Sequence, residues 1–421
     1  MFQVMAISYP VASMGHRTGH DLNEDITSNQ VLASAPPRYK YKPLSSPESV
    51  RLLTLEPAGG INDPIACTLS EHIWSKDALN IPLFRALSYT WGDQTERQDI
   101  IVDGALVSVT KNLHEALQHL RGINFCETWW IDALCVDQKN LKERSQQVGK
   151  MRNIFSNATE VVAWLGPTAD GSDEVMGLIG ERTFGIILDD CSDRDPSEIS
   201  HGDSNVHWSI VHFLTRPYWS RVWVIQEIVL AKDVTLLCGT QTAGWLDYEY
   251  FVYGLQRHWW ASTGGLNMRA YSDLLNLRQS YRPGLRTLPL TLDLFVRQTK
   301  TTAATDKRDH IFALLGMVKH GHGRDIRPDY EASICSTYCV AIRAMYQDKL
   351  EDGSSSSEEH TWWNRSGKQL LEWECPHLSL DLEVSGRAGC DGRGPCRAAE
   401  LCFAMATLYQ DFIQGGHRWT S

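Results

Sequence analysis

The chain has 421 residues, of which 43% are hydrophobic, and its formal net charge is −11. This length allows two or three domains around a large apolar core, and the acidic balance argues against a nucleic-acid-binding protein. The N-terminus lacks a positive stretch followed by an apolar one, and no apolar run approaches the length of a bilayer span, so we expect a soluble cytoplasmic protein with neither signal peptide nor membrane span.

The cysteines and histidines show no metal-binding pattern. The eleven cysteines are scattered and odd in number. No Cys-x-x-Cys pair occurs that could complete a zinc site with a histidine pair. We therefore predict no metal site and a reducing, intracellular environment.

The first 45 residues are polar and contain Pro36-Pro37 and Ser45-Ser46-Pro47, so we interpret them as a disordered leader. Strands are predicted over residues 50–55 and 86–91. Residues 100–102 and 105–109 are two apolar runs separated by Asp103-Gly104, a pair typical of a tight β-hairpin turn.

The next segments alternate between helical and extended patterns. Asn112 and Asn140 each have a glutamate three residues later, which predicts two capped helices. Strands are predicted over residues 129–138 and 160–165. Strand and helix in alternation favour an α/β fold with a parallel sheet flanked by helices.

The later part of the chain is predicted to be mainly helical. Residues 207–231 suggest two helices broken at Arg216-Pro217, residues 234–238 a short strand, and residues 246–320 mostly helices. We therefore divide the chain into a leader (1–45), an α/β domain (46–240), a helical extension (241–345) and a poorly ordered tail (346–421).

The segment 129–138 carries two carboxylates. An unpaired buried carboxylate is costly, so Asp132, within the apolar run, should have a partner or a function. Asp137 and Gln138 would lie at the carboxyl end of the strand, where α/β sheets bind ligands. Alternatively, Asp132 only accepts hydrogen bonds from backbone or tryptophan N–H groups that fix a loop.

Three motifs occur in order along the chain: Ala86-Leu87-Ser88-Tyr89-Thr90-Trp91-Gly92, the Trp130–Gln138 segment, and Tyr218-Trp219-Ser220-Arg221-Val222-Trp223-Val224-Ile225-Gln226-Glu227. Together they resemble the heterokaryon incompatibility (HET) domain of filamentous fungi. A downstream segment, residues 306–316, resembles one that often follows this domain. The resemblance covers about residues 50–335, and the tail lacks the usual continuation.

This resemblance implies a role in nonself recognition and programmed cell death. It also implies a TIR-like, flavodoxin-like fold, with self-association or other death-signalling proteins as partners. Some TIR domains cleave NAD with a glutamate in a Trp-x-x-x-Glu helix, and Trp223 and Glu227 have that spacing. The resemblance therefore also implies NAD as a candidate substrate, with Glu227 and Asp132 as candidate catalytic residues. It further suggests Ser88, Trp91, Asp137, Gln138, Arg144 and Trp223 as candidate ligand-binding residues.

The residues around Glu227 are consistent with a perturbed carboxylate. Trp223 and Glu227 share one helical face, and the helix is apolar almost all round. Burial would raise the pKa of Glu227 unless a cation pairs with it, and a structural ion pair with Arg221, Arg144 or Arg152 is the alternative.

Two other candidates have plainer explanations. Ser88 at a strand end often only satisfies backbone, and Arg144 at a helix start often only pairs with a carboxylate such as Glu143 or Asp137. Neither a Gly-x-Gly-x-x-Gly nor a P-loop motif occurs. Three hypotheses stay open: a self-associating signalling module, an NAD-consuming enzyme, and an inactive family member.

Overall fold

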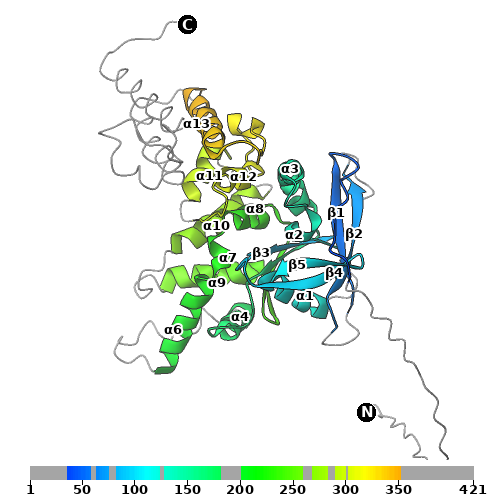
Figure 1. Cartoon of the computed structure of the whole chain (residues 1–421). Helices are drawn as coiled ribbons and strands as arrows, with labels where there is room; N and C mark the ends of the chain where they lie inside the picture. Colours follow the sequence, from blue (N-terminus) through cyan, green and yellow to red (C-terminus); the bar gives the residue numbers. More distant parts are fainter. Residues whose placement is uncertain are drawn as a thin grey trace, which may run out of the picture. The chain divides into compact units, whose positions relative to one another are not determined.

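A single mixed β-sheet organises the part of the chain that the structure describes. The structure is a computed structural model that describes residues 36–57, 63–74, 82–123, 128–181, 201–258, 268–282, 290–299 and 302–351. Within these ranges nine strands pair in the order β5-β4-β2-β1-β6-β3-β7-β8-β9 (Figure 1). They are β1 (Ser49–Leu55), β2 (Ala66–Ile73), β3 (Arg85–Tyr89), β4 (Arg97–Val102), β5 (Ala105–Thr110), β6 (Thr128–Trp130), β7 (Val161–Trp164), β8 (Val234–Cys238) and β9 (Gln241–Gly244).

The centre of the sheet is parallel and its flanks are largely antiparallel. β3 lies between β6 and β7, parallel to both, and β8 continues the parallel run beyond β7. β1 pairs antiparallel with β2 and β6, and β8 pairs antiparallel with β9. The predicted α/β class is therefore confirmed, whereas a wholly parallel sheet is wrong. Antiparallel neighbours arise where the connection is too short for a crossover helix, as between β8 and β9.

The predicted hairpin is present between β4 and β5. Asp103 and Gly104 both have positive φ angles, 48° and 76°. Two consecutive positive values are typical of a type I′ turn, whose twist matches that of the flanking strands. The Asp-Gly pair was a sufficient signal because few other residue pairs adopt this conformation without strain.

One strand prediction was too long. β6 ends at Trp130, and residues Asp132–Cys135 form a single helical turn, α2, in place of a strand continuing to Gln138. The amide N–H groups of Leu134 and Cys135 both donate to the Ile131 carbonyl oxygen. An apolar run of this length has no periodicity that separates a strand from a buried helical turn.

The two predicted helix caps have different outcomes. Asn140 caps α3 (Leu141–Asn157), because its side chain accepts a hydrogen bond from the Glu143 N–H at 3.2 Å. Asn112 lies inside α1 (Lys111–Ile123), and Thr110 Oγ1 instead accepts from the Leu113 N–H at 3.4 Å. Asn112 bridges two strand ends, donating to the Thr90 carbonyl oxygen and accepting from Trp164 Nε1.

The later chain is mainly helical, and the helix-breaking Pro217 begins a helix of its own. The remaining helices are α4 (Ser172–Glu181), α6 (His201–Leu214), α7 (Pro217–Ser220), α8 (Val222–Leu230), α9 (Trp245–His258), α10 (Met268–Tyr281), α11 (Leu292–Gln298), α12 (Asp309–Leu315) and α13 (Ile334–Glu351), with a 3₁₀ turn, η2 (His322–Asp325). α8 packs on β3 and also on α3, α10 and α12, so it lies between the sheet and the C-terminal helices (Figure 1).

The end of the expected leader belongs to the folded chain. The Tyr39 N–H donates to the Leu106 carbonyl oxygen at 2.9 Å, and Tyr41 Oη donates to the Leu134 carbonyl oxygen at 3.0 Å. Residues 36–45 are therefore ordered against the hairpin and α2, contrary to the sequence-based expectation. Residues 1–35, and the tail from residue 352, lie outside the described residues.

Candidate functional site

A buried glutamate on α8 contacts the central strand of the sheet. Glu227 is only 5% exposed, because α8 buries almost every side chain that it carries. Ser88 on β3 donates from Oγ to Glu227 Oε2, and the same Oγ lies 2.8 Å from Tyr218 Oη. Tyr218 comes from α7, the short helix before α8. These three side chains form a hydrogen-bonded chain, which we call the Ser88–Glu227 network.

The protonation of Glu227 is set mainly by burial. Removal from water raises the pKa of Glu227 to about 7, while Arg221 and the Ser88 hydrogen bond lower it and Asp132 raises it slightly. Both forms of the carboxyl group are therefore populated near neutral pH. A carboxyl group with such a pKa can accept or donate a proton there.

Arg221 is the cation that most lowers the pKa of Glu227. Its Nη1 donates to the Tyr89 carbonyl oxygen at the end of β3. The positive charge lowers the pKa of Glu227 without cancelling the effect of burial. The structural ion pair considered from the sequence is thus replaced by a neutral hydroxyl contact, and Arg144 and Arg152 are not among the groups that shift Glu227.

Asp132 lies beside this network and is half-buried, as the first residue of α2. Its Oδ2 accepts a hydrogen bond of 2.8 Å from Trp91 Nε1, and its Oδ1 accepts from the Ala133 N–H at 2.7 Å. The Asp132 carboxylate also helps to raise the pKa of the Tyr89 phenol, after the larger effect of burial. The tryptophan N–H contact considered from the sequence is therefore formed, and it fixes the Trp91 ring next to the network.

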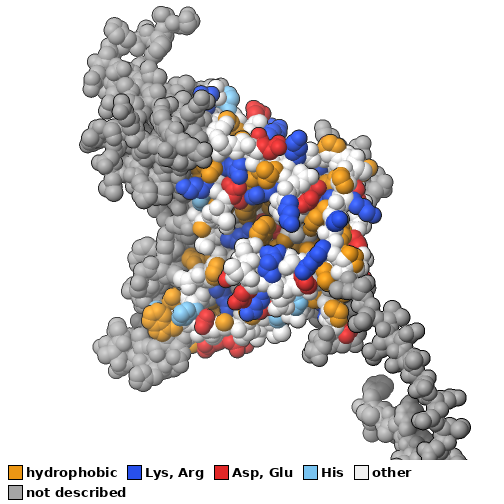
Figure 2. Space-filling view, viewed as in Figure 1, with side chains coloured by type: hydrophobic (Ala, Val, Ile, Leu, Met, Phe, Trp, Pro, Cys, Tyr) orange, Lys and Arg blue, Asp and Glu red, His pale blue; other side chains and the backbone are white. Residues whose placement is uncertain are grey.

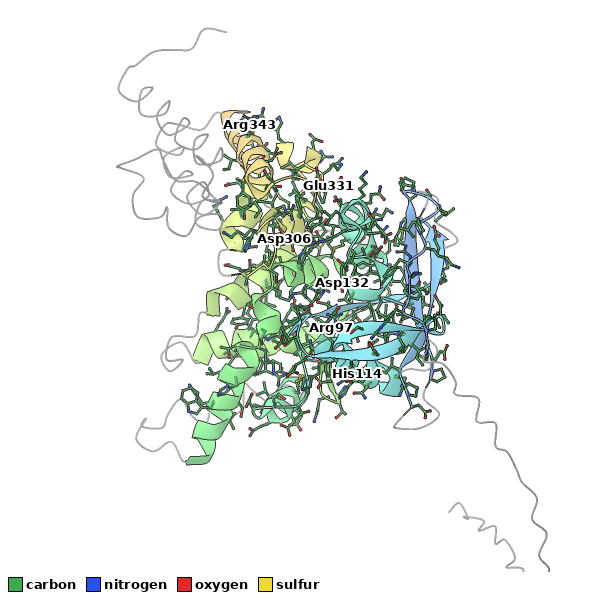
Figure 3. The ribbon with its side chains drawn as sticks, viewed as in Figure 1. Arg97, His114, Asp132, Asp306, Glu331 and Arg343 are labelled. Carbon is green, nitrogen blue, oxygen red and sulfur yellow. The ribbon has the colours of Figure 1, made fainter. Side chains whose placement is uncertain are left out.

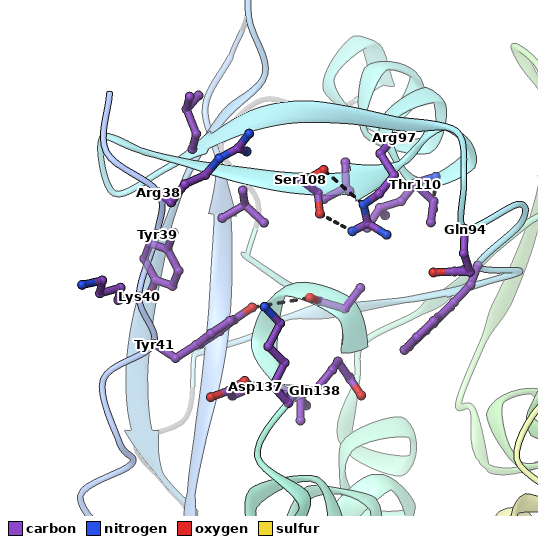
Figure 4. Close-up of a pocket in the computed structure, with 18 of the residues that line it drawn as sticks. Arg38, Tyr39, Lys40, Tyr41, Gln94, Arg97, Ser108, Thr110, Asp137 and Gln138 are labelled. Atoms are coloured by element: carbon purple, nitrogen blue, oxygen red, sulfur yellow. Dashed lines mark hydrogen bonds between the residues drawn. The ribbon is translucent and has the colours of Figure 1, made fainter. Parts of the chain in front are cut away.

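Three further candidates line a pocket next to the network. Trp91, Asp137 and Gln138 contribute to a pocket of about 810 Å³ between the β4–β5 hairpin and α2 (Figure 4). Ser88, Asp132 and Glu227 are not among the described residues that line it. Trp91 and Ala133 connect the pocket to Asp132, because each lines the pocket and donates a hydrogen bond to Asp132.

Arg144 and Trp223 lie in a separate cluster, at the start of α12. The Arg144 guanidinium lies 3.6 Å from the centre of the Tyr330 ring, with Nη2 3.8 Å from Asp306 and 3.9 Å from Asp309. Trp223 helps to lower the pKa of Asp309, although burial raises it overall. Arg144 therefore pairs with carboxylates, as one of the alternatives expected, but these are Asp306 and Asp309 and not Glu143 or Asp137. Figure 3 labels Asp306 and Asp132 among the side chains.

Sequence reasoning missed the tyrosines that complete these sites. Tyr218 is the first residue of the third motif, and the helix break at Pro217 is the signal that could have placed it next to Ser88. Tyr39 and Tyr41 fell inside the expected leader, although paired aromatics are unusual for a disordered segment. The proposed roles of all eight candidate residues stay predictions.

Comparison with protein families gives a match over the segment that contains the Ser88–Glu227 network. Residues 84–227 match the family model described as heterokaryon incompatibility protein (HET). This segment is a HET domain. The match begins just before β3 and ends at Glu227, so the HET domain includes Ser88, Asp132, Tyr218 and Glu227.

A characterised relative extends the similarity beyond the HET domain. The chain is 29% identical over 369 residues to heterokaryon incompatibility protein 6, OR allele, of Neurospora crassa. The aligned region covers 73% of this chain and 53% of the relative, so the chain spans about half the length of that protein. No solved structure matches the chain.

Neither a metal-binding cluster nor a membrane-spanning helix occurs among the described residues. No group of three or more His, Cys, Asp or Glu side chains there could hold a metal ion. None of the helices in the described ranges is both long enough and apolar enough to cross a membrane.

Proposed function

We propose that this chain acts in heterokaryon incompatibility, as a HET-domain protein that detects nonself in fused fungal cells and signals programmed cell death. The observation that carries the proposal is that the HET match and the Ser88–Glu227 network cover the same segment. The name of the Neurospora relative agrees with this role. The protein would act in the cytoplasm, through self-association or through other death-signalling proteins.

A TIR-like arrangement of the central strands is part of the proposal. β6, β3, β7 and β8 are parallel neighbours, and helices connect β6 to β7 and β7 to β8. The antiparallel flanks are additions to such a core. The comparison with TIR domains therefore applies to these four strands and not to the whole sheet.

An NAD-consuming activity is a second candidate, and one observation favours it. The pKa of Glu227, about 7, suits a group that stabilises developing positive charge or transfers a proton as nicotinamide leaves. Against it, Glu227 is 5% exposed and does not line the pocket, so a substrate would have to displace its contacts with Ser88. We therefore place this activity second.

The test is to express the full chain from an inducible promoter in a filamentous fungus. We expect induction to reduce colony viability, measured by dye exclusion and regrowth. The variants Glu227→Gln and Ser88→Ala test the network, and Glu174→Gln, an exposed glutamate on α4, is the matched control. Accumulation of the wild-type protein without loss of viability would contradict the proposed function.

Measurement of NAD in the same cultures separates the two mechanisms. A fall in NAD that precedes death and disappears in Glu227→Gln would support the enzyme. Death at constant NAD, with the protein in assemblies on size-exclusion chromatography, would support signalling by self-association. Killing by the wild type and by both network variants alike would leave the network a structural role only.

A further inference from the structure

The pocket beside the Ser88–Glu227 network is lined by four parts of the chain. Tyr39–Tyr41 lie along one side and Gln94 along the other, with Arg97 and Ser108 on the hairpin above and Asp137 and Gln138 below (Figure 4). Its volume, about 810 Å³, falls in the range of pockets that hold small molecules and cofactors. A ligand of several rings or of a ring with a polar chain would fill it.

The lining is strongly cationic for so acidic a chain. Arg38, Lys40, Arg97 and Lys139 line the pocket, against the single carboxylate of Asp137, which gives a formal charge of 4 − 1 = +3. The whole chain carries −11. Basic side chains gather on the face over β4 and β5 (Figure 2). A local excess of positive charge on an acidic protein favours an anionic ligand.

The cations reach the pocket from different elements. Arg97 is anchored across the hairpin, where its Nε donates to Ser108 Oγ at 3.1 Å. Arg38 forms an exposed ion pair with Asp99 at 2.6 Å, so it contributes less net charge. Lys40 and Lys139 also line the pocket and are exposed, Lys40 between Tyr39 and Tyr41 and Lys139 next to Gln138. Such an arrangement suits a phosphate group, which accepts hydrogen bonds from several directions.

The aromatic side chains present rings whose polar atoms are already bound to protein. Trp91 Nε1 donates to Asp132, and Tyr41 Oη donates to the Leu134 carbonyl oxygen. Gln94 and Gln138 each donate their side-chain N–H to a backbone carbonyl oxygen, at 3.2 Å and 2.9 Å. Each glutamine thus has its amide oxygen left to accept from a ligand, while the rings offer stacking surfaces.

We propose that this pocket binds a nucleotide, that is, an aromatic base carrying phosphate groups. The base stacks on the aromatic side chains and its amino group donates to a glutamine oxygen, while Arg97 and the two lysines bind the phosphates. Binding at Trp91 would then affect the Ser88–Glu227 network through Asp132, because the Trp91 indole N–H donates to Asp132 and the charge of Asp132 acts on Glu227. Binding of this kind is independent of whether the protein kills cells.

Isothermal titration of the full chain with three probes tests this chemistry. ADP carries both groups, adenosine lacks the charge, and inorganic pyrophosphate lacks the ring. We expect ADP to bind at least about tenfold more tightly than either fragment, and to weaken as salt is added. Absence of ADP binding, or pyrophosphate binding as tightly as ADP, would overturn the proposal.

Substitutions locate the site. The double variant Lys40→Gln/Lys139→Gln should weaken ADP binding about tenfold, since each removes one charge near the phosphates. Lys142→Gln is the control, because Lys142 is exposed on α3 and does not line the pocket. An equal loss in the control, or none in the double variant, would contradict this placement.

A labelling experiment on the wild-type chain avoids any dependence on folded variants. ADP should protect Lys40 and Lys139 from acetylation by an activated ester, with Lys142 as the internal reference, read by mass spectrometry. Protection of neither pocket lysine at saturating ADP would place the nucleotide elsewhere and overturn the proposal.

Discussion

Two buried glutamates, Glu143 on α3 and Glu227 on α8, are 6% and 5% exposed, yet their partners differ. Arg51 Nη1 and Nη2 bind the two carboxylate oxygens of Glu143 at 2.5 Å and 3.2 Å, and the Asp137 N–H donates to it at 2.8 Å. Glu227 instead contacts the Ser88 hydroxyl. Burial alone therefore does not fix the charge of a carboxyl group; the partner decides it.

The pairing also indicates different roles. Arg51 lies on β1, and it also donates to the carbonyl oxygens of Cys135 and Lys42. The Glu143–Arg51 pair therefore joins β1, α2 and α3, and both terminal nitrogens of Arg51 donate hydrogen bonds. This is the structural ion pair that the sequence offered as an alternative for Glu227, formed by another glutamate. Glu227 keeps a carboxyl group that can change its charge near neutral pH.

The largest expected effect comes from removing the partner of Glu143. Arg51→Met leaves a buried carboxylate without its cation, and we expect the free energy of unfolding to fall by about 3–5 kcal/mol. Urea denaturation of the full chain, followed by tryptophan fluorescence, measures it.

A double variant separates the ion pair from simple loss of packing. Arg51→Met/Glu143→Met removes both charges, so we expect it to recover much of the stability lost in Arg51→Met. If the single variant were as stable as the wild type, the pair would contribute nothing and the contrast with Glu227 would fail.

Glu227→Gln has the next largest effect, and its sign depends on pH. Because the pKa of Glu227 is raised from 4.5 to about 7, its neutral form contributes stability that is present below pH 4.5 and lost as the pH rises through 7. Glutamine resembles the neutral form. We expect the variant to match the wild type at pH 5 and to exceed it by about 2–3 kcal/mol at pH 8.

Chemical denaturation at both pH values checks this prediction. Glu143→Gln is the matched control, because it breaks a charged pair and should destabilise the chain at pH 8. If Glu227→Gln were also less stable at pH 8, then the attraction of Arg221 would outweigh burial, and Glu227 would be a second ion-paired residue like Glu143.

Sequence reasoning was sound where a signal is local. The Asp103-Gly104 turn and the Asn140 cap depend on a few adjacent residues, and both are present. Ser88 and Glu227 were both candidate site residues, and the structure brings them into direct contact.

Long-range pairing was beyond the sequence. Arg51 and Glu143 are 92 residues apart, and nothing near Arg51 distinguishes it from an exposed arginine on a strand. Arg144 and Trp223 were grouped with Ser88 because of their motifs, but the packing of α12 on α8 brings them to Asp309 instead. Asp132 was expected inside a strand, and a helical turn leaves it half-buried.

The smallest expected effect tests whether Asp132 interacts with Glu227 of the Ser88–Glu227 network. Asp132 raises the pKa of Glu227, less than burial does, so Asp132→Asn should lower that pKa. Asparagine Oδ1 can still accept from Trp91 Nε1. We therefore expect the free energy of unfolding of Asp132→Asn to fall less between pH 5 and pH 8 than that of the wild type. The two falls should differ by under about 1 kcal/mol, because Asp132 is partly solvated. Asp137→Asn is the control: its charge does not act on Glu227, so an equal change there would mean that the effect is a general loss of negative charge.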